Sequence, residues 1–518
     1  MIIRHLSLSF LFLLLVLNAM SCAETTSSDE ATVITNATII DGTGSDRFTG
    51  DLLIQDGVIK EIGTVDRDRF PNASIIDAEG RVVAPGFIDL HSHGDPLETP
   101  DFENFLSMGV TSISLGQDGR SAAVEDVDSW MRSVDEVGTG PNILHFKGHG
   151  TLRQLTDSPQ EPDLPEEKLD EMMSLMRSSM EAGSFGMSTG LEYQFGRYTT
   201  MDELTALGEI VAEFDGVVMS HVRNEDDDQV EESIRELIEQ GEKSGAKVHV
   251  SHIKIVYGND PSRADDVLQV MNEARERGVE VTADVYPYAA SFTGIGIVFP
   301  DWATEGDYDQ IVADRREELA EYLRNRVNMR NGPEATLFGT APWAGMTLAD
   351  VAEELDKPFE DVLIDDIGPR GASAAYFVMN ENVMQRFLQD PFVMVSSDGS
   401  PTMRHPRGYG SFAKIIRKYV VEEELLTLEE AVFKMNGQSA ELLGLSDSEK
   451  VEIPRGMIKE GFAADLVIFD PEQVRDTADF ENPHQLAEGF EWVLVNGVAV
   501  IENGEINENR PAGVIRRR

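Results

Sequence analysis

The chain has 518 residues, and its 94 Asp and Glu against 43 Lys and Arg give a formal net charge of −51. This negative charge argues against non-specific binding to nucleic acid or to an anionic lipid surface, since both have the same sign. With 41% hydrophobic residues, the composition is typical of a globular protein with a large core. The surplus carboxylates suit either a salty medium or an ordinary acidic surface.

The N-terminus has the pattern of an export signal. Residues 6–17 are an apolar run too short to span a bilayer, and small residues follow it, so residues 1–23 are predicted to be a signal peptide. Cys22, the only cysteine, resembles a bacterial lipoprotein site, although the four residues before it depart from the usual pattern and cleavage after Ala23 is the alternative. We expect an exported protein, periplasmic or membrane-anchored through a lipid on Cys22, with a linker over residues 24–31.

Short strand patterns with Gly, Asn and Asp turns occur near both ends of the remaining chain. They cover residues 32–40, 52–62 and 74–78, and then residues 464–469, 491–496 and 498–502. Because these two groups flank a different pattern, we expect one small β-sandwich domain built from residues 32–84 and 460–518.

The intervening region alternates strands and helices. Eight runs, mostly apolar at the start and polar at the end, are predicted as strands: 82–93, 110–118, 142–150, 184–191, 216–225, 246–254, 280–288 and 392–399. Stretches such as 165–183 and 229–241 place apolar residues at helical spacing. Eight such repeats predict an α/β fold, a (β/α)8 TIM barrel over residues 85–459. The long seventh gap predicts an insertion at about 289–391, a candidate lid or substrate-binding element.

Metal-ligating residues end several of these strands. His91 and His93 have period-2 spacing, so both imidazoles can bind one ion. Four further residues end strands two, five, six and eight: Asp118, His221, His252 and Asp398. Active sites of such barrels lie at these strand ends, and imidazole with carboxylate suits Zn, Mn, Fe or Co.

Other histidines have plainer interpretations. His249 has the opposite strand parity to His252, so we expect it to face the outer helices. His145 and His149 belong to strand three, and we expect them to support the metal ligands without binding the metal themselves. His405 follows strand eight, where a structural role is expected.

The chain also carries an ordered set of family motifs. They lie at residues 85–93, 148–153, 186–193, 220–225, 251–254, 284–288, 397–399, 405–410 and 461–466. With these motifs the chain resembles the D-aminoacylase (N-acyl-D-amino-acid deacylase) family of the amidohydrolase superfamily. The resemblance implies a (β/α)8 barrel with a small β domain and a metal-dependent enzyme that hydrolyses linear amides.

The resemblance also implies roles for individual residues. The four histidines His91, His93, His221 and His252 look like metal ligands, and Asp398 looks like both a ligand and the catalytic base. Lys254, Tyr286 and Arg407, with Tyr193, look like substrate-binding residues that hold its carboxylate or reacting carbonyl. Arg223 and Glu225 are candidates to orient His221 from behind.

One position departs from the family. Where the family usually has Cys in Gly-Asn-Cys-Gly, this chain has Gly116-Gln117-Asp118-Gly119. Asp118 can supply an oxygen ligand and can bridge two ions. We therefore expect one or two Zn²⁺ ions, with Mn²⁺ or Co²⁺ as alternatives, because a carboxylate is harder than a thiolate and should weaken the selectivity for zinc.

The expected reaction is hydrolysis of N-acyl-D-amino acids. A bound metal activates water and polarises the acyl carbonyl, Asp398 accepts the proton of the water and returns it to the leaving amine, and Lys254 and Arg407 anchor the α-carboxylate. A dipeptidase, a cyclic-amide hydrolase or a deaminase of the same superfamily would have a similar site. A non-catalytic exported binding protein is a more remote alternative.

The side-chain preference of the substrate has one indication in the sequence. Residues 289–300 contain no Lys or Arg, which favours neutral or apolar D-residues over D-Glu or D-Asp. The sequence leaves the oligomeric state open.

Overall fold

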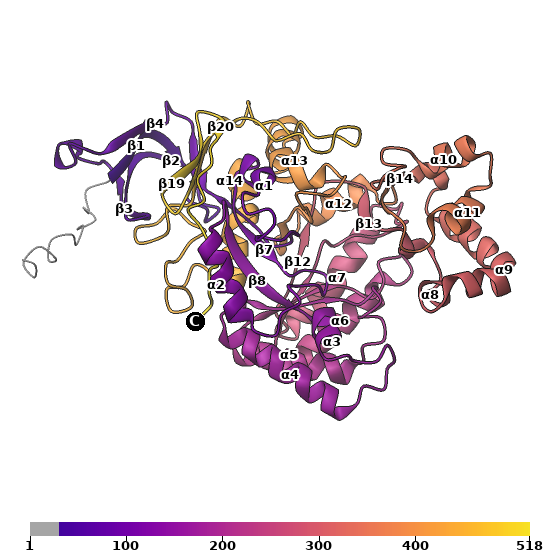
Figure 1. The fold of residues 1–518 in the computed structure, drawn as a ribbon. Coiled ribbons are helices and arrows are strands. Elements are labelled where there is room, and N and C mark those ends of the chain that lie inside the picture. The colour runs from indigo at the N-terminus through magenta and orange to yellow at the C-terminus, as the bar shows by residue number, and fades with distance from the viewer. Residues whose placement is uncertain (1–30) are drawn as a thin grey trace, which may run out of the picture.

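The computed structural model describes residues 31–518 (Figure 1). The predicted signal peptide, with Cys22 and the cleavage site, lies outside the described residues. Within residues 31–518, no helix is both long enough and apolar enough to cross a membrane.

Eight parallel strands form the predicted barrel. They are β6 (Phe87–Asp89), β7 (Val110–Leu115), β8 (Asn142–Gly148), β9 (Gly186–Gly190), β10 (Val217–His221), β11 (Lys247–Val250), β12 (Val281–Val285) and β16 (Val393–Val395). They are hydrogen-bonded in chain order from β6 to β16, and a parallel bridge between Ser92 and Gly399 joins the first and last strands. The TIM barrel is therefore confirmed. The first predicted strand, residues 82–93, is divided, because Val82–Pro85 pairs in the other sheet and only Phe87–Asp89 belongs to the barrel.

Helices surround this barrel (Figure 1). They are α1 (Glu103–Ser107), α2 (Val127–Val137), α3 (His149–Leu155), α4 (Glu166–Glu181), α5 (Met201–Glu213), α6 (Val230–Ser244), α7 (Arg263–Glu276), α12 (Glu381–Leu388), α13 (Arg407–Lys414), α14 (Leu428–Val432) and α15 (Gln438–Leu443). Wider π-type turns at Ile415–Glu422 and Phe433–Gly437 continue α13 and α14. The methionine stripe of α4 is buried at Met172, Met176 and Met180, as its spacing predicts.

The two ends of the chain share one nine-stranded sheet. Its strands are β1 (Ala31–Ile39), β2 (Phe48–Gln55), β3 (Val58–Gly63), β4 (Ser74–Asp77), β5 (Val82–Pro85), β17 (Leu466–Phe469), β18 (Phe490–Val495), β19 (Val498–Glu502) and β20 (Glu505–Ile506). Antiparallel pairing of β5 with β17 joins the N-terminal to the C-terminal half. Strands far apart in the sheet share one core that includes Ile34, Leu52 and Leu494, so the sheet folds over on itself.

The last residues depart from the predicted domain boundary. After β20 the chain returns to the barrel, where Ala512 pairs with Thr139 and Val514 bridges to Ile143 of β8 (Figure 1). The C-terminal segment therefore fastens the β domain to the barrel instead of belonging to the β domain throughout.

The predicted insertion is a separate layer with its own core, at the right of Figure 1. It contains a three-stranded sheet in the order β13 (Ser291–Gly294), β15 (Ser373–Tyr376), β14 (Thr336–Phe338). Its helices are α8 (Asp301–Thr304), α9 (Tyr308–Met329), α10 (Leu348–Leu355) and α11 (Phe359–Val362), with short 3₁₀ or π turns at Ile295–Val298, Pro333–Ala335 and Leu363–Ile367. Leu319, Leu323, Phe338 and Val351 are buried together in it.

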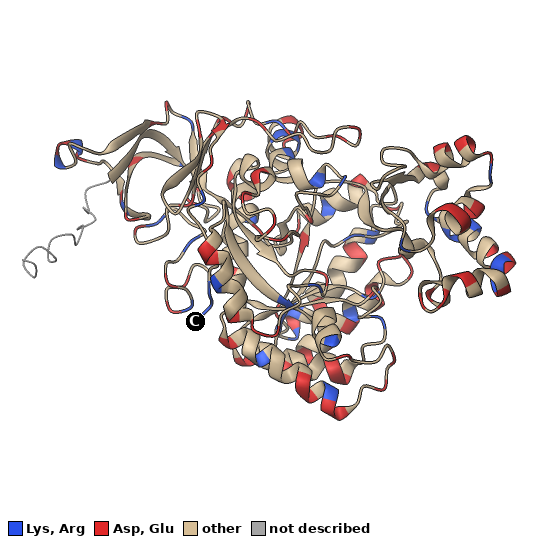
Figure 2. Ribbon diagram, viewed as in Figure 1, with Lys and Arg blue, Asp and Glu red and all other residues tan. Residues whose placement is uncertain are grey.

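Acidic residues are spread over the outer helices of the barrel and of the insertion (Figure 2). This distribution agrees with an acidity that belongs mainly to the outer surface.

Candidate metal centre and active site

Six predicted ligands meet at the carboxyl ends of the barrel strands. Three of them have backbone angles in the left-handed region, with φ of 54° at Asp118, 38° at His252 and 49° at Asp398. Such angles are uncommon outside glycine, and they gather at functional sites where the surroundings hold them in place. Each places a side chain that a regular strand would direct elsewhere.

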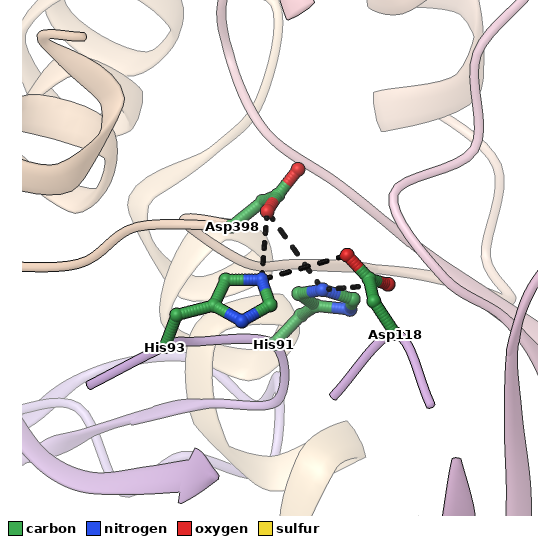
Figure 3. A group of neighbouring side chains, drawn as sticks. All are labelled: His91, His93, Asp118 and Asp398. Carbon is green, nitrogen blue, oxygen red and sulfur yellow. Dashed lines mark hydrogen bonds and ion pairs between the residues drawn. The ribbon is translucent and has the colours of Figure 1, made fainter. Parts of the chain in front are cut away.

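One group of donors contains His91, His93, Asp118 and Asp398 (Figure 3). The Nε2 atom of His91 lies 3.3 Å from Asp118 Oδ1 and 3.8 Å from Asp398 Oδ1. The Nε2 atom of His93 lies 3.2 Å from Asp398 Oδ1 and 3.6 Å from Asp118 Oδ2. Four donor atoms thus converge on one point.

A second group shares Asp118 with the first. The Nε2 atom of His252 lies 3.2 Å from Asp118 Oδ1 and 3.1 Å from Nδ1 of His221. Because Asp118 Oδ1 lies near His91 of the first group and near His252 of the second, while Oδ2 lies near His93, this carboxylate is common to both groups.

The donors fit a divalent cation. His91 is fully buried, and within residues 31–518 neither of its ring nitrogens makes a hydrogen bond of suitable geometry, although Nε2 lies 3.3 Å from Asp118. A buried imidazole without partners is unfavourable unless a ligand completes it. Burial and Lys254 lower the pKa of His252, but Asp118 and Asp398 outweigh them and raise it to about 10. A cation bound among these donors would therefore be stabilised by the two carboxylates. A set of nitrogen and oxygen donors is one that zinc binds well.

Arg407 and Lys254 stand beside these ligands. Arg407 donates from Nη1 to Asp398 Oδ2 at 2.9 Å, and its guanidinium lies 4.7 Å from the centre of the Tyr286 ring. Lys254 Nζ lies 2.6 Å from Glu225 Oε1 and 2.7 Å from His252 Nδ1. Burial alone would raise the pKa of Asp398, but Arg407 and the nearby histidines hold it well below its usual range.

A cavity of about 560 Å³ opens over this cluster. His93, Asp118, Tyr193, Lys254 and Arg407 line it, whereas Tyr286 lies behind Lys254 and Arg407. The insertion forms another wall, because residues 291–294, 296 and 297 and several of its loops face the same space. A small molecule can therefore reach the metal ligands and the two cations together.

Comparison with known proteins settles the family. The model described as "Amidohydrolase family" matches residues 74–501. The chain belongs to the amidohydrolase family. It is 32% identical to an N-acyl-D-glutamate deacylase of Alcaligenes xylosoxydans xylosoxydans, over 94% of this chain and 96% of that protein.

Two solved structures resemble this amidohydrolase over nearly its whole length. One is an N-acyl-D-glutamate deacylase from Bordetella bronchiseptica with zinc and a phosphonate mimic of the tetrahedral intermediate, with TM-score 0.80 and 31% identity, covering 94% of this chain and 100% of that one. The other is a D-aminoacylase described as having a binuclear metal centre, with TM-score 0.79 and 27% identity, covering 94% and 99%. The family resemblance seen in the sequence is confirmed.

Some predictions about this amidohydrolase were wrong. Arg223 does not orient His221, because its guanidinium is bound to Glu236 at 2.8 Å and to two backbone carbonyls. His249 does not face the outer helices: its Nε2 lies 2.7 Å from Asp284, whose other oxygen accepts the backbone N–H of His252.

His145 and His149 do not support the metal ligands either. His145 lies 2.8 Å from Ser184 Oγ and packs on Trp130 of the outer helix α2. His149 lies 2.7 Å from Glu203 in a buried group that also contains Arg153. His405 has the expected structural role, since its ring approaches the carbonyl of Ala290 and accepts the N–H of Arg407.

Three carboxylates near the ligands in this amidohydrolase were not predicted. The first is Glu192, whose carboxylate lies 3.0 Å from Nε2 of His221. Glu225, which was predicted to orient His221, instead faces His252 at 3.3 Å. The other two unpredicted carboxylates are Asp284 and Asp89. Asp284 and Asp89 accept the backbone N–H groups of His252 and His91. Burial raises the pKa of Asp89 to about 7. Polar residues inside otherwise apolar strands were the available signal for Asp89 and Asp284.

Proposed function

We propose that this amidohydrolase hydrolyses the amide bond of N-acyl-D-amino acids and releases a carboxylic acid and a free D-amino acid. The observation that carries the proposal is the placement of Asp398 between the metal-ligating cluster and Arg407, inside a cavity that Lys254 also lines. The named deacylases that resemble the chain over most of its length support it further.

The ligand set would hold one or two zinc ions, with Asp118 shared between the positions. A cation there polarises a carbonyl and lowers the pKa of water toward 7, which is the chemistry that amide hydrolysis needs. The hardness of the Asp118 carboxylate also makes Mn²⁺ and Co²⁺ acceptable in place of zinc.

Asp398 is the proton carrier in this mechanism. Its lowered pKa keeps the carboxylate ionised and able to accept a proton from the attacking water. Arg407 fixes Oδ2, so Oδ1 remains directed at the imidazoles of His91 and His93. The same carboxyl then returns the proton to the leaving nitrogen, which becomes the free amine.

Lys254 and Arg407 would hold the α-carboxylate of the substrate. Both are almost fully buried and both line the cavity, where a carboxylate can add to their bonds with Glu225 and Asp398. Arg407 has an additional unfilled donor, because its buried Nε has no hydrogen-bond partner among residues 31–518. Guanidinium groups suit the planar geometry of a carboxylate.

A substrate panel tests the proposal. Purified protein is offered N-acetyl-D- and N-acetyl-L-amino acids, a dipeptide and a hydantoin, and release of free amine or ring opening is measured. We expect turnover of the N-acetyl-D-amino acids, loss after chelation, and recovery on adding Zn²⁺. Turnover that persists without metal, or that is confined to the L-amino acids, the dipeptide or the hydantoin, would contradict it.

We also propose that the chain is exported in a bacterium and processed near Cys22. The apolar run at residues 6–17 and the small residues after it support this. Mass spectrometry of the mature N-terminus distinguishes a lipid-modified Cys22 from an unmodified end after Ala23. Cys22→Ser should abolish lipid attachment. An N-terminus that retains residues 1–20 would contradict the proposal.

A further inference from the structure

We propose that the cavity contains a second anion site, built around Arg330, that binds a second carboxylate of the substrate. This carboxylate belongs either to the side chain of the D-residue or to the acyl group. The inference rests on the proposed deacylase function and extends it to the class of substrate.

Arg330 is a buried cation at the end of α9. Only 4% of it is exposed, and it lines the same cavity as the metal ligands. Its guanidinium lies over Tyr376 at 4.9 Å and Tyr257 at 5.7 Å, and its Nη1 donates to the Tyr257 hydroxyl at 3.2 Å. Its Nε is buried without a hydrogen-bond partner among the described residues.

Arg330 also differs from its neighbours on α9. Arg326 pairs with Asp226 at 2.6 Å and Arg324 pairs with Glu360 at 2.6 Å, whereas Arg330 has no carboxylate partner within residues 31–518. A buried guanidinium without a counter-charge is unfavourable, and acidic residues outnumber basic ones by 94 to 43 in this chain. A cation left unpaired in a ligand cavity is therefore available for an anion from outside.

The position suits a substrate whose other carboxylate is held at Arg407. Arg407 donates from Nη2 to the backbone carbonyl of Phe292 at 3.3 Å, and the adjacent Ser291 is paired across the sheet with Tyr376, on which Arg330 packs. The start of β13 thus lies between the two guanidinium groups. Both line one cavity, so the proposed substrate would place one anionic group at each of them.

Two further arginines add positive charge to the same wall. Arg370 and Arg404 line the cavity, and among the described residues neither pairs with a carboxylate; each donates to a backbone carbonyl, of Thr304 and Glu481 respectively. The expectation of a neutral or apolar substrate depended on residues 289–300 alone. That stretch does line the cavity, but the cations come from α9 and from loops elsewhere in the chain.

Paired substrates test this site on the zinc-loaded full chain. N-acetyl-D-glutamate is compared with N-acetyl-D-glutamine, and N-succinyl-D-alanine with its neutral succinamide analogue, so that each pair differs by one charge. We expect kcat/KM to favour the charged member of at least one pair by about 10- to 100-fold, the range of a hydrogen bond to a charged group. The pair that shows the preference identifies the source of the carboxylate.

Variants then assign the preference to Arg330. Arg330→Met should remove most of it, with a much smaller change for the neutral substrate, and Arg330→Lys should retain part of it. Arg324→Met, on the same helix but outside the cavity lining, should retain all of it. The same loss for charged and neutral substrates in Arg330→Met, or no charge preference in the unmodified protein, would overturn the second anion site alone. Absence of turnover for every N-acyl-D-amino acid would overturn the deacylase function as well.

Discussion

Arg407 binds one oxygen of Asp398 and leaves the other oxygen facing the metal ligands. The Nη1–Oδ2 distance is 2.9 Å, while Oδ1 lies 3.2 Å from His93 Nε2. Both side chains are nearly fully buried, so the pair acts with little screening from water. The carboxylate is thereby held ionised and oriented, which is the state in which it can accept a proton.

Replacing this carboxylate should abolish most of the activity. Asp398→Asn keeps the size of the side chain but cannot accept a proton, and we expect deacylation to fall by about 10³-fold or more, given the usual contribution of a positioned base. The fold should persist, which circular dichroism and the melting temperature will check. Near-normal turnover in this variant would show that Asp398 is not the base.

The bridging position should control metal preference. Asp118→Cys introduces a thiolate where a harder carboxylate stands, so we expect tighter zinc binding and a smaller affinity for Mn²⁺ relative to zinc. Metal content after dialysis against limiting zinc gives the first measure. With Co²⁺, the variant should also show a thiolate-to-cobalt absorption band that the unmodified protein lacks. Unchanged affinities and spectra would mean that Asp118 does not bind the metal.

The buried pair of Lys254 and Glu225 should be needed for stability. Their side chains are 3% and 10% exposed and lie 2.6 Å apart, so Glu225→Gln leaves a buried ammonium without its counter-charge. Loss of one partner of such a pair typically destabilises a protein by about 3–5 kcal/mol. Denaturant unfolding of the metal-free protein measures this effect. The double variant Glu225→Gln, Lys254→Met should recover part of the loss, and a double variant at least as unstable as the single one would contradict the pairing.

Most of the site could be predicted because parallel strands bring their carboxyl ends to one face. This is why His91, His221 and Asp398, which are far apart in the sequence, were expected together. Side-chain parity was a poorer guide at the sixth strand. Regular pairing of β11 ends at Val250, and the chain then turns through a φ of 38° at His252, so alternation could not be extended from His252 back to His249.

Contacts made by loops could not be predicted in the same way. Glu192 lies in the loop after β9, and Arg330 belongs to the insertion, where only the three-dimensional packing brings it into the cavity. Glu192 does lie in the motif at residues 186–193, but the motif alone did not indicate that its carboxylate would meet His221, and Arg330 belongs to no motif or periodic pattern.

The buried group around Glu203 should make stability depend on acid pH. Burial alone would raise the pKa of Glu203, but hydrogen bonds from Arg153 and His149 outweigh it and hold the pKa at about 2, below the ordinary 4.5. A carboxyl whose pKa is lowered by folding stabilises the protein above about pH 4.5, and this contribution is lost as the pH falls toward 2. The shift corresponds to about 3 kcal/mol at neutral pH.

Glu203→Gln removes this contribution. The difference in unfolding free energy between the unmodified protein and the variant should therefore be large at pH 6. It should shrink steadily as the pH falls from 4.5 toward 2, since the carboxyl then becomes protonated in the unfolded chain while it is still ionised in the folded one. The matched control is Glu213→Gln at the end of the same helix, where an exposed ion pair with Arg177 should contribute little at any pH. Denaturant unfolding at several pH values compares the two, and equal effects of both variants would contradict a special role for the buried group.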